Sequence, residues 1–296
     1  MNSAFTSAPK SGDDRQPRAT VVVLGNEKGG TGKSTSAMHL IVGLLREGYT
    51  VGAIDLDARQ GSLSRYFDNR RIYAAKMGIH LPHPTYRAVG RSELRDRFAA
   101  EQEEQGRLET VLTELSATCD VVVIDTPGSD NPLSRAGHSH ADILITPIND
   151  SFLDLDLLGR IDPETNEVLS LSTYAEMVWE QKKARALRDG GSIDWIVMRN
   201  RLAALDSRNK RNMDVALEVL AGRLGFRLAH GFSERVIFRE LFLKGLTLLD
   251  IREEGADVTL TMSHLAALQE VRNLLQTIGV PEAADELATA RQEMQV

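Results

Sequence analysis

The sequence predicts an α/β fold: a single doubly wound, mostly parallel sheet flanked by helices. Three observations lead to this fold class. Continuous apolar runs, typical of strands buried on both faces, recur along the chain, and amphipathic helical patterns separate them. A glycine-rich loop joins the first of these runs to the first helical pattern. Since neither an internal repeat nor a long linker interrupts the pattern, we expect the 296 residues to form one main domain.

The predicted strands and helices alternate along most of the chain. Strands are expected over residues 20–25, 50–55, 120–125, 141–146 and 193–199, with a weaker one near 225–229. Helices are expected over 33–47, 62–76, 92–117, 151–158, 172–188, 207–224, 234–242 and 260–278. In a parallel sheet of this kind ligands bind at the carboxyl ends of the strands, so the loops that follow the strands are the candidate sites.

The two ends of the chain differ from this pattern. Residues 1–18 are polar and lack the apolar stretch of a signal peptide, so a disordered tail is expected there. The folded domain is expected over 19–280, followed by an acidic C-terminal tail over 281–296. No apolar run is long enough to span a bilayer. The single cysteine, Cys119, excludes an internal disulfide framework and is typical of a reducing cytoplasm.

The glycine-rich loop is the most informative segment. It reads Lys28, Gly29, Gly30, Thr31, Gly32, Lys33, Ser34 and Thr35. Glycines let backbone N–H groups turn inward around a phosphate, and the helix that follows points its positive end at the same place. Lys33 is predicted to reach the β- and γ-phosphates, and the Ser34 hydroxyl to ligate Mg²⁺. The loop therefore predicts a nucleotide site that uses Mg²⁺.

Lys28 departs from the usual GxxxxGK[ST] pattern, in which a glycine stands at the position of Glu27. One interpretation of Lys28 is a solvated loop charge. A second lysine inside the loop is also the mark of a deviant P-loop, and the segment resembles the ATPase family of ParA, MinD and the nitrogenase iron protein. In that family this lysine crosses a dimer interface to the partner subunit's nucleotide. The resemblance implies a homodimer held together by ATP, in which Lys28 stabilises charge on the transferred phosphoryl group.

Acidic turns follow two predicted strands, with Asp57 after the second and Asp125 after the third. Such acids often only end strands, but two carboxylates near Mg²⁺ can also hold metal-bound waters and orient an attacking water. The resemblance assigns hydrolysis to Asp57 in switch I and the acid of switch II to Asp125, both beside the metal. It also assigns a γ-phosphate-sensing N–H to Gly128 and adenine recognition to Asn200, although asparagine is common in turns as well.

The net charge of −7 is unevenly spread. Residues 199–240 contain nine basic and five acidic residues, a local charge of +4. Three of the cations lie in the first turn of the helix predicted over 207–224, where they oppose the helix dipole. A helix end that meets phosphates would tolerate this arrangement, although a solvated surface with scattered ion pairs is the other interpretation. The candidate phosphate-contacting residues are Arg208, Lys210, Arg211, Arg223, Arg227, Arg235 and Arg239.

Longer stretches resemble one branch of the family, the MipZ ATPases. They are residues 25–30, 54–60, 67–71, 146–152, 199–203 and 234–242. The likeness runs from about residue 19 to about residue 275. Within it, residues 77–106 lack motifs distinctive enough to align. It implies a slow Mg²⁺-dependent ATPase switch that dimerises with ATP and inhibits FtsZ polymerisation. The dimer would bind DNA non-specifically, and ParB would recruit the monomer, so the protein would be cytoplasmic, nucleoid-associated and enriched at the poles.

Other members of the fold leave alternatives open. A ParA-type partitioning ATPase would share Lys28, the dimer and the basic segment. A MinD-like membrane ATPase needs a basic amphipathic helix at its C-terminus, whereas 281–296 is acidic, so no membrane contact is expected. An iron protein needs cluster cysteines that this chain lacks. A small-molecule ATP-dependent ligase would be marked by rapid turnover that depends on its substrate.

Overall fold

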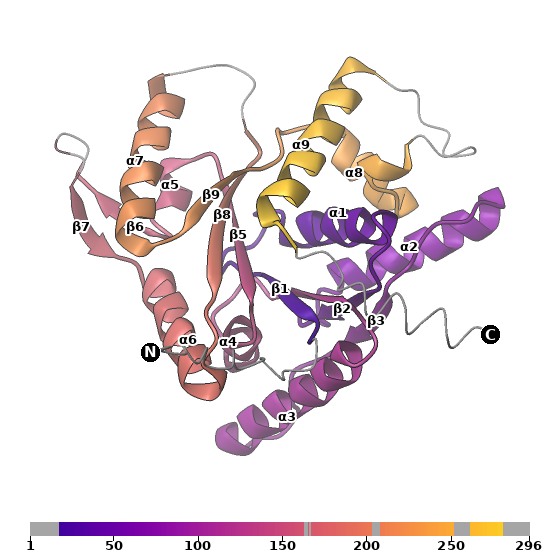
Figure 1. The fold of residues 1–296 in the computed structure, drawn as a ribbon, viewed down its shortest axis with the longest axis horizontal. Helices are drawn as coiled ribbons and strands as arrows, with labels where there is room; N and C mark the ends of the chain where they lie inside the picture. The colour runs from indigo at the N-terminus through magenta and orange to yellow at the C-terminus, as the bar shows by residue number, and fades with distance from the viewer. Residues whose placement is uncertain (1–17, 163–164, 166, 203–207, 252–260, 281–296) are drawn as a thin grey trace, which may run out of the picture.

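The computed structural model describes residues 18–162, 165, 167–202, 208–251 and 261–280. A seven-stranded sheet with the order β3-β2-β4-β1-β5-β8-β9 forms its centre, and all neighbouring strands in it are parallel (Figure 1). Its strands are β1 (Thr20–Leu24), β2 (Val51–Asp55), β3 (Thr85–Ala88), β4 (Val121–Asp125), β5 (Ile143–Asn149), β8 (Asp194–Asn200) and β9 (Arg227–His230). The predicted α/β fold is thereby confirmed.

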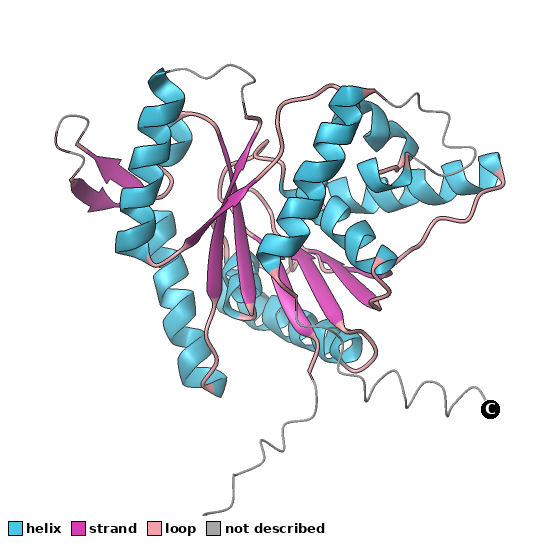
Figure 2. Ribbon diagram, turned by 45° about the horizontal axis from the view of Figure 1, so that its top comes forward, coloured by secondary structure: helices cyan, strands magenta, loops and turns pink. Residues whose placement is uncertain are grey.

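Helices cover both faces of the sheet, each over its own apolar core (Figure 2). The first core is covered by α1 (Lys33–Arg46), α2 (Ser62–Met77), α8 (Ile237–Lys244), the 3₁₀ helix η1 (Leu248–Asp250) and α9 (Met262–Ile278). The second is covered by α3 (Arg97–Ser116), α4 (Pro132–Ser139), α5 (Phe152–Leu155), α6 (Thr173–Asp189) and α7 (Arg208–Leu224). In the part of the chain described, no helix has the length and apolarity needed to cross a membrane.

Several elements differ from the sequence-based expectation. The edge strand β3 and the short helix α4 were not expected, because neither has a long apolar repeat. The helix expected over 151–158 is only the one-turn α5, and the chain then forms an antiparallel pair of strands, β6 (Gly159–Ile161) and β7 (Val168–Leu171). The helix expected from residue 92 begins at Arg97, because the Asp96 carboxylate caps it by accepting from the Ala99 N–H at 2.7 Å. The two predicted tails lie almost wholly outside the described residues.

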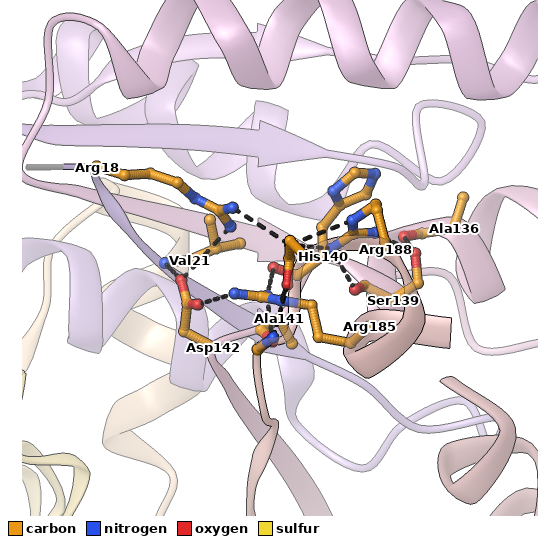
Figure 3. A network of polar contacts seen from close by, with 11 residues as sticks. Arg18, Val21, Ala136, Ser139, His140, Ala141, Asp142, Arg185 and Arg188 are labelled. Atoms are coloured by element: carbon orange, nitrogen blue, oxygen red, sulfur yellow. Dashed lines mark hydrogen bonds and ion pairs between the residues drawn. The ribbon is translucent and has the colours of Figure 1, made fainter. Parts of the chain in front are cut away.

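A polar network closes the amino end of the sheet (Figure 3). The buried Arg185 guanidinium on α6 donates to the carbonyls of His140 and Ala141 at 2.9 and 2.8 Å, just past α4. It also pairs with Asp142, whose other oxygen accepts from the Val21 N–H of β1 at 2.7 Å. We call this network the amino-end cluster; its members are Arg18, Val21, His140, Ala141, Asp142, Arg185, Arg188 and Asp189. It ties α4 and α6 to the strands at the end opposite the glycine-rich loop.

Candidate nucleotide-binding site

The glycine-rich loop lies at the carboxyl end of β1 and leads directly into α1. Gly30 and Gly32 have φ angles of 74° and 90°, in the left-handed region that glycine adopts at little cost. Gly32 also approaches the Asn200 side chain so closely that a Cβ would collide with its Nδ2. Glycine at position 32 is therefore required both by the backbone conformation and by the space available.

Asn26 holds the start of this loop, although the sequence analysis did not single it out. The buried side chain donates from Nδ2 to the Pro147 carbonyl at 2.6 Å, and its Oδ1 accepts from the Lys28 N–H at 2.7 Å. It thereby connects the loop to β5. An amide that directly follows a buried strand was the available signal, because such a side chain must find partners inside the protein.

Lys33 points into the curve of the loop. Its Nζ donates to the Lys28 carbonyl at 2.9 Å, and the residue is buried. Burial lowers the pKa of Lys33, while the carboxylates of Asp125 and Asp57 act in the opposite direction. The ammonium group is thus surrounded by the loop backbone and by the two acids that the sequence predicted to lie near it.

Lys28 points away from the loop. Its Nζ lies 3.1 Å from Asp154 Oδ1 and also donates to the Leu153 carbonyl, both in α5. Asp154 is anchored in turn, because its other oxygen accepts from the Asn149 N–H at 3.0 Å. The Lys28 side chain is 38% exposed. In a single subunit Lys28 is therefore paired at the surface instead of turned toward Lys33.

Asp125 ends β4 beside the loop, with Leu24 of β1 and Asp55 of β2 as its strand neighbours. Burial raises the pKa of Asp125 to about 7, against a hydrogen bond from the Ser34 hydroxyl. Its Oδ1 is buried and has no hydrogen-bond partner. The structure thus brings Asp125 and Ser34, two of the three predicted metal ligands, into direct contact.

Asp55 orders the turn that carries Asp57. Its Oδ1 accepts from the Asp57 N–H at 2.8 Å, and its Oδ2 accepts from the Ser64 hydroxyl at 2.9 Å. Burial raises the pKa of Asp55, and these hydrogen bonds act against the increase. Asp57 itself is only half-buried. The sequence analysis missed the role of Asp55, although its position as the last residue of a buried strand was the signal.

Gly128 lies against the loop from the other side. A Cβ at this position would stand 3.0 Å from the Gly29 nitrogen, so only glycine fits without displacement. The segment after β4 therefore packs directly on the glycine-rich loop.

A cavity of about 400 Å³ continues from the loop. Gly32 and Thr35 line one side, and Phe232, Phe238 and Phe242 form an aromatic wall, in which the first two rings stack 5.3 Å apart. Asn200 lies where the loop meets the cavity. Its Nδ2 donates to the Thr31 carbonyl at 2.7 Å and its Oδ1 accepts from the Arg201 N–H at 3.0 Å, so the amide braces the loop in this structure.

The residues present fit a nucleotide with Mg²⁺. Buried polar atoms are nearly always hydrogen-bonded, yet Asp125 Oδ1 and Thr31 Oγ1 are buried without a partner. An anionic oxygen at Asp125 suits a hydrated Mg²⁺, and a hydroxyl at Thr31 suits a phosphate oxygen. Ser34, bonded to Asp125, supplies a second oxygen at the same place.

The predicted basic residues fall into different environments. Arg208 and Lys210 lie in the first turn of α7, and their side chains are outside what the structure describes. Arg211, Arg223 and Arg239 are exposed. Arg227 pairs with Asp194 and donates to the Thr277 carbonyl at 3.0 Å. Arg235 is only 15% exposed and pairs with Glu270. Exposure and ion pairing overlap in this set, because Arg227 is itself 48% exposed and the exposed Arg239 lies 3.8 Å from Glu234.

Comparison with known protein families shows which family this chain belongs to. A family model described as ATPase MipZ matches residues 20–282. The chain belongs to the MipZ family of ATPases. This confirms the resemblance inferred from the P-loop and the longer stretches, and places the chain among the ParA/MinD-like P-loop ATPases.

Two curated proteins are also similar to the MipZ-family chain. A putative replication protein A from Rhizobium rhizogenes is 28% identical over 50% of this chain, and the match spans only 45% of that protein's own length. The septum site-determining protein MinD of Helicobacter pylori is 25% identical over 59% of this chain and 71% of its own length.

Solved structures share the fold at lower identity. The ATP complex of a substituted McdA from Cyanothece has a TM-score of 0.58 at 16% identity and covers 90% of this chain and 98% of its own. A putative plasmid partition protein from Borrelia burgdorferi, bound to AMPPNP, has a TM-score of 0.54 at 18% identity and covers 88% and 99%. MinD from Pyrococcus horikoshii, complexed with Mg-ADP, has a TM-score of 0.53 at 17% identity and covers 90% and 99%. At these identities the likeness shows the fold alone.

Proposed function

We propose that this protein is a slow, Mg²⁺-dependent ATPase switch that dimerises with ATP and regulates where the cell divides. The family match over residues 20–282 is the observation that carries this proposal. The position of Lys28 and the Mg²⁺-compatible oxygens around Asp125 support it from the geometry.

The residues of the loop would bind and orient the triphosphate. Gly29 to Gly32 offer backbone N–H groups, and the Lys33 ammonium and the hydroxyls of Ser34 and Thr35 lie at the start of α1. Bound Mg²⁺ would neutralise charge on the phosphates. Asp125 and Ser34 would hold the metal together with Asp57, and Asp57 would orient the attacking water. The Gly128 N–H would contact the γ-phosphate.

Lys28 would act across the dimer. In one subunit it contacts Asp154 and the Leu153 carbonyl, at a position that is partly exposed. We propose that it exchanges these contacts for the partner subunit's nucleotide when two ATP-bound subunits meet. The exchange replaces a carboxylate by a phosphate, so the lysine remains paired with an anion throughout.

The cavity beside the loop would take the adenine. The wall of Phe232, Phe238 and Phe242 offers a surface on which a base can pack. Asn200 lies at the entrance and would hydrogen-bond the base edge, which requires one of its present bonds to the loop to rearrange. A base-reading role of Asn200 thus remains a prediction.

We call the seven candidate phosphate-contacting residues of 208–239 the basic group. They would bind DNA without sequence preference in the ATP dimer. Arginine and lysine contacts to phosphates supply this kind of binding. Arg211, Arg223 and Arg239 are exposed, and Arg239 is 77% exposed with its nearest carboxylate at 3.8 Å. Arg208 and Lys210 would extend this surface. Arg227 and Arg235 would first have to leave Asp194 and Glu270.

The partners in this proposal are FtsZ, whose polymerisation the dimer inhibits, and ParB, which recruits the monomer. The protein would be cytoplasmic, bound to the nucleoid and enriched near the poles. Purified FtsZ should be sedimented with ATP and this protein, with Lys33→Ala as control. We expect the wild type to reduce pelletable polymer only with ATP, and the variant to leave it intact. Unchanged assembly, with ATP-dependent dimerisation intact, contradicts FtsZ inhibition.

A ParA-type partitioning ATPase is the second candidate. The fold shared with the Borrelia plasmid partition protein favours it, as does the basic group. A ParB-dependent rise in ATP turnover, without any effect on FtsZ assembly, would assign the chain to partitioning.

A further inference from the structure

A chain of four buried groups connects the interior of the second core to the start of the P-loop. Trp195 Nε1 on β8 lies 2.9 Å from Thr146 Oγ1 on β5. Thr146 Oγ1 lies 2.9 Å from the Tyr174 hydroxyl of α6, and this hydroxyl lies 2.9 Å from the Gly25 carbonyl. Gly25 directly follows β1 and precedes the loop. Side chains from β8, β5 and α6 are thereby linked in series to the carbonyl of Gly25, between β1 and the loop.

The direction of every hydrogen bond in this chain is determined by chemistry. An indole N–H only donates, so Thr146 accepts from Trp195. A carbonyl only accepts, so Tyr174 gives its single proton to Gly25. The remaining bond must then run from the Thr146 hydroxyl to the Tyr174 oxygen. Each of the two hydroxyls accepts one hydrogen bond and donates one. This arrangement fixes the direction of the Tyr174 O–H bond.

Gly25 is also enclosed sterically. A Cβ at this position would collide with His138 Nε2 and would lie 2.9 Å from Leu144 Cδ1. His138 Nδ1 donates to the Ser134 carbonyl at 2.7 Å, and burial lowers its pKa to about 4, so the ring is neutral and its Nε2 carries no proton. This Nε2 is 3.4 Å from the Tyr174 oxygen, farther than the Gly25 carbonyl. The residue that leads from β1 toward the loop is thus held on two sides.

We propose that Tyr174 is a positioning residue of the nucleotide site: its hydroxyl, oriented by Thr146 and Trp195, fixes the Gly25 carbonyl and with it the path of the P-loop. This proposal rests on nucleotide binding at the loop. Neighbouring hydrogen bonds at this point come from the Asn26 side chain, from the Gly25 N–H, which donates to the Ile145 carbonyl at 2.9 Å, and from the Thr126 hydroxyl, which donates to the Leu24 carbonyl at 2.8 Å. Without the Tyr174 hydroxyl the Gly25 carbonyl would be buried without its hydrogen-bond partner.

The test compares two tyrosine-to-phenylalanine variants. Tyr174→Phe removes the positioning hydroxyl. Tyr66→Phe removes a hydroxyl that is equally buried and donates to the Leu246 carbonyl at 2.7 Å, away from the loop. Tyr174→Phe loses the bonds to Gly25 and Thr146, and Tyr66→Phe loses the bond to Leu246, so we expect thermal stability to fall in both variants and further in Tyr174→Phe. We expect Tyr174→Phe alone to bind AMPPNP with Mg²⁺ about tenfold more weakly, because an unpaired buried carbonyl weakens the preorganised loop.

A spectroscopic readout separates positioning from general stability. In a Trp179→Phe background, Trp195 is the single tryptophan and lies at the far end of the chain of hydrogen bonds. We expect AMPPNP to shift its emission, and Tyr174→Phe at saturating AMPPNP to lose the shift. Equal AMPPNP affinity in wild type and Tyr174→Phe, or an emission shift that survives the substitution, overturns the positioning role alone. A wild-type protein that fails to bind AMPPNP contradicts both this role and the proposed function.

Discussion

The two ends of the central sheet differ in whether their buried polar atoms have hydrogen-bond partners. At the carboxyl end, Asp125 Oδ1, Thr31 Oγ1 and Asn149 Oδ1 are buried without partners, as are Ser36 Oγ and Arg199 Nε. A further such atom, Glu104 Oε2, lies on α3. At the amino end, no side chain described in the amino-end cluster carries such an atom (Figure 3). Each buried polar group without a hydrogen-bond partner lowers the stability by about 1–3 kcal/mol. A ligand bound at the carboxyl end could supply the missing partners.

The two ends should therefore respond differently to substitution. Changes at the carboxyl end should affect nucleotide chemistry, and changes at the amino end should affect stability. The predictions that follow test this difference, from the largest expected effect to the smallest.

Lys33→Ala should abolish measurable ATP binding. It removes the cation that the loop places for the phosphates, and charged hydrogen bonds of this kind make affinity fall about 100-fold or more. Titration calorimetry with AMPPNP and Mg²⁺ measures the effect, with the exposed Lys183→Ala as a matched control. Unchanged affinity in Lys33→Ala would refute the P-loop assignment.

Asp57→Ala should separate binding from hydrolysis. We expect the variant to dimerise with ATP but to hydrolyse it about 100-fold more slowly, because no carboxylate then orients the attacking water. Phosphate release and size-exclusion chromatography with ATP provide the two measurements. A normal rate of phosphate release would show that another residue performs this task.

Arg185→Met should destabilise the protein and leave nucleotide affinity unchanged. The substitution leaves the carbonyls of His140 and Ala141 and the carboxylate of Asp142 without their shared partner, at a cost of about 3 kcal/mol. Urea unfolding measures the loss. A large fall in AMPPNP affinity, with the variant folded, would show that the two ends are coupled.

Lowering the pH should reduce the stability of the protein, because a buried histidine near each end of the sheet would have to take up a proton. Burial lowers the pKa of His138, beside Gly25, and of His140, in the amino-end cluster, to about 4. Because the unfolded-state pKa is about 6.5, the unfolded state takes up the proton first, so stability is lost as the pH falls from about 6.5 to 4. We expect a loss of about 2 kcal/mol per histidine between pH 7.5 and 5, measured by urea unfolding. Replacing His140 by Gln should remove its share of this slope, and an unchanged slope would contradict its assignment.

Charge reversal should weaken DNA binding by an amount that depends on where the basic residue lies along the sheet. Arg208 and Arg211 follow the carboxyl end of β8, whereas Arg227 begins β9 at the amino end and pairs with Asp194. We expect Arg208→Glu with Arg211→Glu to weaken binding to duplex DNA about tenfold at fixed salt, with ATPase activity nearly unchanged. Arg227→Glu should have a smaller effect. Equal losses would extend the DNA surface toward the amino end, and no loss in either variant would remove it.

The sequence predicted most of what depends on local pattern. The glycine-rich loop, Asp57 and Asp125 were predicted as site residues because glycine spacing and strand ends are visible in a few consecutive residues, and their roles stay predictions. The long helices were found because their apolar repeat is long. The edge strand β3 and the pair β6–β7 were missed, because their short segments are largely exposed and leave no continuous apolar run.

The sequence by itself determined the fold class, the family and the position of the glycine-rich loop, since each depends on patterns among residues close together in the chain. Only the tertiary structure decided which polar groups share a neighbourhood. Arg235 meets Glu270, and Tyr174 meets Gly25 across 149 positions in the chain. Only the structure shows that Asp55 orders the turn that carries Asp57 and that Asn200 braces the loop. Such partners are chosen when strands and helices pack, because a buried polar group must be satisfied by whichever side chain the fold brings to it.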